Sequence, residues 1–182
     1  RWRIPYFLDH KDAAHHHPVV VMIRTSLEIA AHGFETERVI RYLKTDLAPV
    51  SRDEVDLLEN EALRLGVQGE AWRRLEPWPE RGFASRPRHG VSGEEVARIR
   101  RTATEPLLDF ARGVYALTRG DGDGDAPARV PVAPLREYLK LLRTLLAANG
   151  VAETLASWID RAVAGDQPLL AQEHAQVWEG VT

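Results

Sequence analysis

The chain has 182 residues, of which 44% are hydrophobic and 28% are charged, and its formal net charge is −3. This mixture is typical of one globular domain with a sizeable core, and it excludes a disordered chain. The longest apolar run covers only Val19–Ile23, far short of the roughly 20 residues of a membrane-spanning helix. The absence of cysteine excludes disulfides and thiolate metal sites, and it agrees with a cytoplasmic protein.

The N-terminal stretch alternates loosely between polar and apolar residues. Because Pro5 cannot donate to a sheet ladder, we expect a short edge strand or extended arm over residues 1–9. The sequence starts without Met and shows no leader-like apolar stretch. We therefore expect a piece of a larger protein without a signal peptide.

Beyond this arm, apolar residues recur at spacings of three and four, which is the pattern of amphipathic helices. The predicted helices cover residues 18–31, 36–44, 54–65, 93–117, 131–148, 151–163 and 166–178. The sequence therefore predicts an all-α fold, a bundle of about seven helices preceded by the extended arm.

Capping residues set the expected helix ends. Ser51 and Glu54 have the spacing of a capping box, and Gly66 follows directly after the helix that they begin. Thr36 and Asp166 are the expected N-caps of two other helices.

Two helices carry more detailed expectations. In the first, Val20, Ile23 and Leu27 share one face, which we expect to be buried. Ser92 and Glu95 form a second capping box before the long helix, and Pro106 should kink or split that helix.

Charge is unevenly distributed along the chain. Residues 71–101 hold eight Arg against four Glu, whereas residues 51–70 and 150–182 each carry a net charge of −4. A basic segment in an acidic chain is typical of a surface that faces a polyanion, although Arg-rich loops are also often simply solvated. Both interpretations stay open at this point.

Basic side chains can neutralise phosphates without recognising a base sequence. The candidate nucleic-acid-binding residues are Arg41, Lys44, Arg73, Arg74, Arg86 and Arg88. Trp72, Trp78 and Phe83 lie among them, and such interleaving can bind single strands by stacking. For Trp72 itself we favour a place in the core.

Other motifs give no reaction centre. The adjacent residues His15–His17 point in different directions on a helix or strand, so we expect them to cap or hydrogen-bond rather than share a metal ion. Asp121–Asp125 copies half of a calcium loop, but Ala126 and Val132 stand where Gly and Glu are needed. No phosphate loop, dinucleotide fingerprint or nucleophile elbow occurs. We therefore expect no catalytic residue, metal or cofactor in this chain.

Several short strings are shared with one known family. They are IPYFLD at 4–9, His17-Pro18, RYLKTDL at 41–47, VDLLEN at 55–60, GVQGEAW at 66–72 and EHAQVW at 173–178. These strings resemble the AddB (RexB)-type subunit of the AddAB ATP-dependent helicase–nuclease, whose pattern contains "IPYFID…HPL", "RYLKTDL" and "(I/V)DLLEN…GI.G..W". The chain departs from the pattern at Asp12, where a basic residue is usual, and at Val19, where Leu is usual.

The resemblance implies that residues 10–182 form subdomain 2B, a helical insertion of a superfamily 1 helicase-like protein, and that residues 1–9 are an edge strand of its motor domain. Such a subdomain is not an enzyme but supports the DNA path and subunit packing. The parent uses ATP and Mg²⁺, holds an iron–sulfur cluster elsewhere, and resects double-strand breaks for recombinational repair with an AddA-type partner. The alternative is a free-standing helical adaptor that binds a protein through an apolar groove.

Overall fold

The computed structural model describes residues 14–74, 76–79, 90–119 and 134–181. Within these ranges the chain forms seven α-helices and no strand, which confirms the expected all-α class. The expected arm at residues 1–9 and the calcium-like loop at 121–125 lie outside the described residues. None of the described helices is both long and apolar enough to cross a bilayer.

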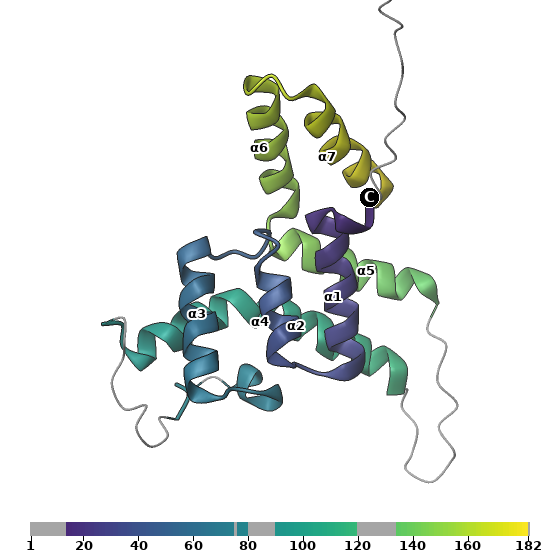
Figure 1. The fold of residues 1–182 in the computed structure, drawn as a ribbon. Coiled ribbons are helices and arrows are strands. Elements are labelled where there is room, and N and C mark those ends of the chain that lie inside the picture. The colour runs from purple at the N-terminus through teal and green to yellow at the C-terminus, as the bar shows by residue number, and fades with distance from the viewer. Residues whose placement is uncertain (1–13, 75, 80–89, 120–133, 182) are drawn as a thin grey trace, which may run out of the picture.

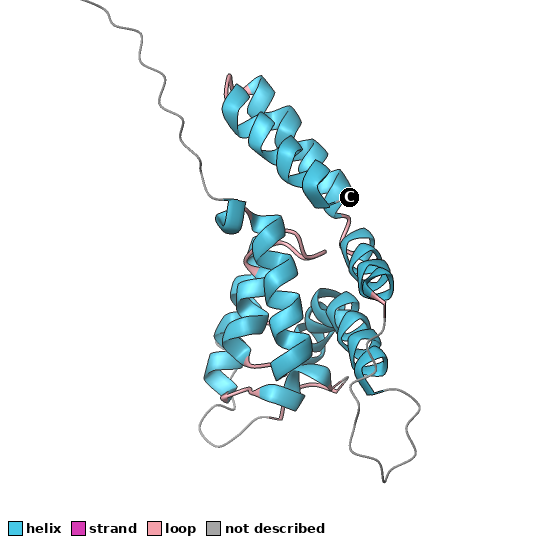
Figure 2. Cartoon of the chain, turned by 90° about the vertical axis from the view of Figure 1, so that its right-hand side faces the viewer, coloured by secondary structure: helices cyan, strands magenta, loops and turns pink. Residues whose placement is uncertain are grey.

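The helices form a bundle with a projecting hairpin. In chain order the elements are η1 (Ala14–His16), α1 (Pro18–His32), α2 (Thr36–Leu43), α3 (Arg52–Leu65), η2 (Gly69–Arg73), α4 (Gly93–Arg119), α5 (Leu135–Ala148), α6 (Val151–Ala164) and α7 (Pro168–Val181). In Figure 1, α4 crosses behind α1, α2 and α3, and α5 packs along α4. α6 and α7 pair with each other and project from this bundle, as the turned view in Figure 2 also shows.

Local sequence fixes both ends of α3 as expected. The Ser51 hydroxyl accepts from the Glu54 N–H, and the Glu54 carboxylate accepts from the Ser51 N–H at 2.8 Å, which completes the capping box. At the other end Gly66 adopts the left-handed conformation, with φ 62° and ψ 39°. The Val67 N–H then donates to the Ala62 carbonyl at 2.8 Å, which closes the helix and turns the chain toward η2.

The prediction that Thr36 caps α2 is wrong. Glu35 is the N-cap residue, and Thr36 is the first residue of the helix. The Thr36 hydroxyl donates instead to the Val67 carbonyl at 2.5 Å and accepts from Trp72 Nε1 at 2.9 Å. The Thr36 hydroxyl therefore makes long-range hydrogen bonds and does not cap the helix, which residues near it in sequence could not indicate.

The prediction that Asp166 caps α7 is also wrong. Asp166 has a φ of 55° and lies in the turn that ends α6. The next residue, Gln167, donates its N–H to the Ala162 carbonyl at 2.8 Å, the same closure that Val67 makes after α3. Asp166 thus occupies the left-handed position that Gly takes more often, because its short polar side chain tolerates that conformation.

The core lies between α1, α2, α3, α4 and η2. Its largest fully buried side chains include Trp72, Tyr42, Met22, Ile29, Leu43, Leu47, Leu58 and Leu107. From α1 the buried face runs through Val19 and Met22, so the predicted face is wrong by one position, and Leu27 is 46% exposed. Because the run at 19–23 is apolar on every side, its periodicity could not identify the inward face.

The long helix α4 runs through Pro106 without a break, which excludes the predicted split. The apolar residues that recur along α4 at spacings of three and four form a stripe, which is buried at Val96, Ile99, Ala103, Leu107 and Phe110. Gly113 then allows α5 to approach closely, because a Cβ at this position would lie 2.5 Å from Leu141 Cδ2.

Candidate functional site

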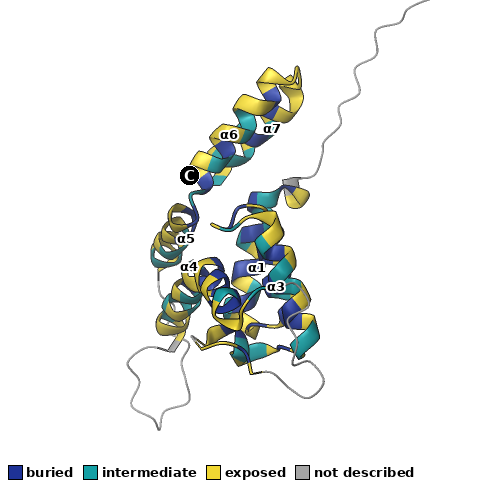
Figure 3. Cartoon of the chain, turned by 90° about the vertical axis from the view of Figure 1, so that its left-hand side faces the viewer, coloured by how far each residue is buried: buried dark blue, intermediate teal, exposed yellow. Residues whose placement is uncertain are grey.

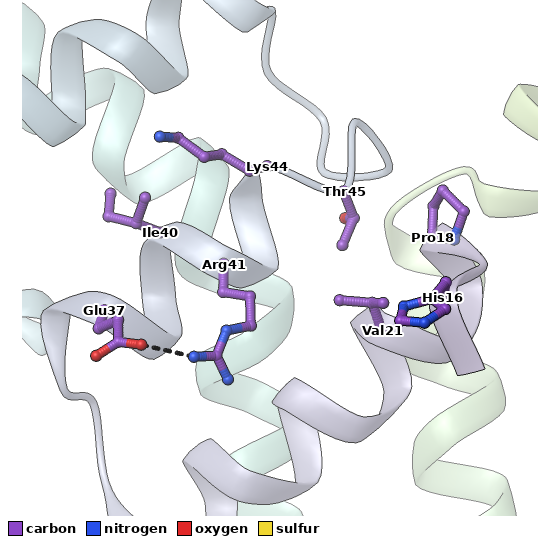
Figure 4. A pocket seen from close by; sticks show the side chains of 8 residues that line it. All are labelled: His16, Pro18, Val21, Glu37, Ile40, Arg41, Lys44 and Thr45. Carbon is purple, nitrogen blue, oxygen red and sulfur yellow. Dashed lines mark hydrogen bonds and ion pairs between the residues drawn. The ribbon is translucent and has the colours of Figure 1, made fainter.

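Arg41 and Lys44 line an open groove between α2 and the start of α1, as Figure 4 shows. The groove has a volume of about 400 Å³, and Pro18, Val21 and Ile40 contribute apolar lining to it. The lining can bury hydrophobic groups, and Arg41 and Lys44 are its cationic side chains for contact with a phosphate.

Both of these cations are paired with glutamates. Arg41 lies 2.6 Å from Glu37 and 3.6 Å from Glu28, and Lys44 lies 2.6 Å from Glu59. The Arg41–Glu37 contact is the dashed line in Figure 4. Partly exposed pairs of this kind add little stability. They do oppose DNA binding here, because a phosphate would compete with three carboxylates for two cations.

Arg73 and Arg74 lie at the end of η2. Arg73 pairs with Glu70 at 2.8 Å, and its guanidinium lies 5.8 Å from the centroid of the Phe34 ring. The Arg74 side chain is exposed to solvent. Of the four described candidates, Arg74 is therefore the one best placed to meet a phosphate.

The structure separates the described candidates into two groups. Trp72 of η2 bonds to Thr36 at the start of α2, whereas Arg41 and Lys44 lie at the end of that helix. The two groups of candidates therefore lie toward opposite ends of α2. The other two candidates, which lie outside the described residues, are Arg86 and Arg88.

Neither described tryptophan offers a stacking platform, which confirms the core position predicted for Trp72 and excludes stacking at Trp78. Trp72 is completely buried, as we favoured from the sequence, and Trp78 is only 7% exposed. Their rings meet edge to face with centroids 5.0 Å apart, and Trp78 Nε1 donates to the Ala71 carbonyl at 2.9 Å. These indoles close the end of the core and offer no free face to a base. Phe83 lies outside the described residues.

A buried arginine, which the sequence analysis missed, holds the segment around Arg74 in place. Arg100 of α4 is fully buried, and its Nη2 donates to the carbonyls of Arg74 and Glu76, both at 2.7 Å. Its guanidinium lies 4.8 Å from the centroid of the Trp78 ring, a cation–π contact. The signal was present in the sequence, because Arg100 stands four residues after Val96, within the apolar stripe of α4.

The burial of Arg100 has an electrostatic cost. Burial, with a smaller effect of the neighbouring Arg101, lowers the pKa of Arg100 to about 10, although Glu76 opposes the shift. The group still carries its charge at neutral pH. Within the described part of the chain, its Nε and Nη1 atoms have no hydrogen-bond partner. Arg100 therefore acts as a clamp on two carbonyls and an indole.

A second buried polar pair joins the hairpin to the bundle. His17 Nε2 lies 2.8 Å from His174 Nδ1, and His17 Nδ1 accepts from the Val19 N–H at 3.3 Å. Because Nδ1 is an acceptor, the proton of neutral His17 is on Nε2, which donates to His174. Burial and the proximity of His174 lower the pKa of His17 to about 4. His17 thus both caps α1 and anchors α7, which confirms the hydrogen-bonding role expected from the sequence.

Comparison with known proteins links the chain to one kind of subunit. No family model matches it. It is 37% identical to the B subunit of the ATP-dependent helicase/deoxyribonuclease of Symbiobacterium thermophilum and 37% identical to that of Pelotomaculum thermopropionicum, over 98% of the chain in each case. The corresponding protein of Moorella thermoacetica is 36% identical over 99% of the chain. The chain is homologous to a region of these AddB-type subunits. It spans about 15% of the length of the relatives that it matches.

The buried polar groups described above join structural elements and do not form a metal site. Across the described ranges, no three His, Cys, Asp or Glu side chains gather as a metal site would require. The buried polar groups instead join elements: Thr36 joins α2 to η2, Arg100 joins α4 to the segment after η2, and His17 joins α1 to α7. The arrangement is suited to holding helices in fixed positions.

Proposed function

We propose that the chain is a non-catalytic helical subdomain of the AddB-type subunit of an ATP-dependent helicase–nuclease. Residues 10–182 would form the inserted subdomain, and residues 1–9 an edge strand of the motor. The observation that supports this most is the 37% identity over 98% of the chain to about 15% of such a subunit. In this role the subdomain supports the DNA path and the packing of subunits during resection of double-strand breaks.

The fold supports a scaffolding role. The fully buried side chains include Trp72, Tyr42 and Arg100, and all three link elements distant in sequence. A subdomain that transmits position between neighbours needs such fixed packing, because loosely packed helices would not hold a DNA path.

The charges support an auxiliary role toward DNA rather than a strong binding site. The net charge is −3, and Arg41, Lys44 and Arg73 are paired with carboxylates. Few phosphates would be neutralised by this chain alone, so its own affinity for DNA would be low and strongly reduced by salt. The partners in this proposal are the rest of the AddB-type polypeptide, an AddA-type subunit and DNA held mainly by other parts of the complex.

The test is turnover by the purified chain. We expect neither DNA-stimulated ATP hydrolysis nor degradation of a labelled linear duplex above a protein-free blank, with the complete helicase–nuclease as the positive control. A trace of activity can come from a contaminating enzyme. Any signal is therefore repeated with a Trp72→Ala variant at a urea concentration between the two unfolding midpoints, where the variant is unfolded and the unchanged chain is folded. Turnover that follows the folded chain would refute the non-catalytic role.

A further inference from the structure

The tip of the α6–α7 hairpin exposes large apolar side chains. Val163 is 64% exposed, Leu169 is 82% exposed and Leu170 is 39% exposed. Among the described residues, eight large hydrophobic side chains are exposed, and three of them fall within the eight positions 163–170. Figure 3 shows the far end of the hairpin projecting beyond the bundle, with much of its surface exposed. Clustering of this kind on a projecting element marks an interaction surface.

The tip is rigid rather than a loose loop. α6 ends in the closed turn at Asp166, and α7 begins directly at Pro168, whose fixed φ suits the first helical position. Only three residues, 165–167, connect the two helices. A short closed connection presents the apolar side chains in one arrangement, which lowers the ordering cost of binding.

The hairpin is also held in a fixed orientation at its base. The Tyr42 hydroxyl of α2 donates to Asn149 Oδ1 at 2.9 Å, just before α6, and both residues are buried. Burial raises the pKa of Tyr42, which keeps its hydroxyl protonated and donating. This contact fixes the connection from which α6 begins, and the His17–His174 bond ties α7 to the bundle.

Charge identifies what can cover the tip. Residues 151–181 carry five acidic side chains and one Arg, a net charge of −4. Asp160 and Asp166 flank the exposed Val163. An acidic surface repels DNA, anionic lipid and a second copy of itself. The complementary surface is an apolar pocket with a rim of Lys and Arg on a protein.

We propose that the tip formed by Val163, Leu169 and Leu170 docks into a basic-rimmed apolar pocket on another part of the same AddB-type polypeptide. The proposal rests on the proposed function, since it takes this chain as a segment of that polypeptide. The matched relatives contain about 85% of their length outside the aligned segment, because the chain covers 15% of them. A surface tethered in the same polypeptide is present at an effective concentration on the order of millimolar, well above that of a separate subunit.

The experiment measures amide hydrogen exchange at residues 163–171 in three samples: the isolated chain, the full-length AddB-type subunit that contains it, and the complete helicase–nuclease. We expect exchange in the full-length subunit alone to be about tenfold slower than in the isolated chain, because docking excludes water from the first turn of α7. We expect little further change in the complete complex.

The variant is the pair Val163→Glu and Leu169→Glu, the two most exposed apolar residues of the tip, which places charge in the pocket without touching the core. Its control is Leu63→Glu on α3, a leucine that is 69% exposed outside the hairpin. The double variant should lose the protection in the full-length subunit, the control should keep it, and neither should change the unfolding of the isolated chain. The protection should also weaken as salt rises, because the rim contacts are ionic.

Three results would overturn the proposal. Equal exchange in all samples would mean that nothing covers the tip. Protection that appears only with the AddA-type partner would place the pocket in trans. Equal loss in the Leu63→Glu control would mean that the effect is not local to the tip. All three leave the proposed function standing, because that function fails only if the isolated chain turns over ATP or DNA.

Discussion

The region around Trp72 and the α6–α7 hairpin are both helical, but apolar packing and polar bonds contribute to them in different proportions. Around Trp72, large apolar side chains from five elements fill one core, and Trp72 and Tyr42 are completely buried. In the hairpin the buried residues are Val151, Leu155, Ala162, Ala171 and His174, which fill much less volume. Apolar volume therefore fixes the bundle, whereas in the hairpin a smaller apolar contribution, from Val151 and Leu155 at the edge of the same core, is joined by two long-range polar bonds. This difference in packing suits the bundle to a role as a rigid support and the hairpin to a role as a docking element.

The same substitution in the two regions would test this contrast most strongly. Trp72→Ala removes the largest core side chain and leaves the Thr36 hydroxyl without its indole donor. We expect a loss of about 3–5 kcal/mol in the free energy of unfolding. Trp158→Ala in α6 removes a half-buried indole 5.4 Å from the His174 ring, and we expect a loss of about 1–2 kcal/mol.

Urea unfolding followed by far-ultraviolet circular dichroism measures both variants. If the two losses are equal, the bundle and the hairpin do not differ in how they are held, and the contrast is wrong. If Trp158→Ala instead costs more than Trp72→Ala, the hairpin rather than the bundle would contain the main core.

The second prediction concerns the pH dependence of the hairpin anchor. The ordinary pKa of histidine is 6.5 and that of folded His17 is about 4, so the unfolded chain binds this proton more readily. The stabilisation is complete above pH 6.5 and is lost as the pH falls from 6.5 to about 4. Its full size is about 3 kcal/mol, since one pKa unit corresponds to about 1.4 kcal/mol.

The variant that isolates this effect is His17→Asn. Asparagine can still accept the Val19 N–H as an N-cap, but it does not titrate. We expect its urea midpoint to change less between about pH 7 and about pH 4.5 than that of the unchanged chain. His15→Asn is the control, because His15 is exposed and should leave the profile as it was. A profile that His17→Asn does not flatten would mean that another group titrates with folding.

The sequence predicted the fold where the signals were local. The capping box at Ser51 and the stop at Gly66 depend on residues within one turn, and both are confirmed. The α1 face was wrong, because an all-round apolar run gives no direction. The predicted caps at Thr36 and Asp166 were wrong for two reasons. The Thr36 hydroxyl bonds to Trp72, a distant partner, and Asp166 adopts a left-handed backbone conformation in a turn.

The candidate site was harder to predict for the same reason. Composition identified basic residues, but it could not show that Arg41 and Lys44 face glutamates from other helices, Glu28 and Glu59. The sequence analysis missed Arg100, because a charged side chain is expected at the surface. Its spacing from Val96, however, places it on the buried face of α4. The Arg41–Glu37 and Arg73–Glu70 pairs follow local spacings of four and three residues. The contacts with Glu28 and Glu59 depend on tertiary packing, which no local pattern records.

Tyr42→Phe tests the hydrogen bond at the base of the hairpin. The variant keeps the ring in the core but removes the donor to Asn149 Oδ1, and it leaves that buried oxygen unsatisfied. We expect a loss of about 1–2 kcal/mol. Hydrogen exchange should show it first in α6 and only weakly in α3, because the bond joins α2 to the start of the hairpin. A uniform rise in exchange across the bundle would contradict this.

The smallest effect is expected for the affinity for DNA, when the arginines at the end of η2 are removed. In the complete helicase–nuclease, Arg73→Ala with Arg74→Ala should weaken DNA binding by about two- to fivefold, with the salt slope reduced by at most about 2. The loss is small because Arg73 already pairs with Glu70.

The matched control is Arg161→Ala, which removes an exposed arginine from the acidic hairpin and should leave the affinity unchanged. Fluorescence anisotropy with a labelled duplex over a salt series measures both. If the hairpin variant weakens binding as much as the η2 pair, the acidic hairpin also contacts the DNA, and the assignment of DNA support to one region and protein docking to the other is wrong.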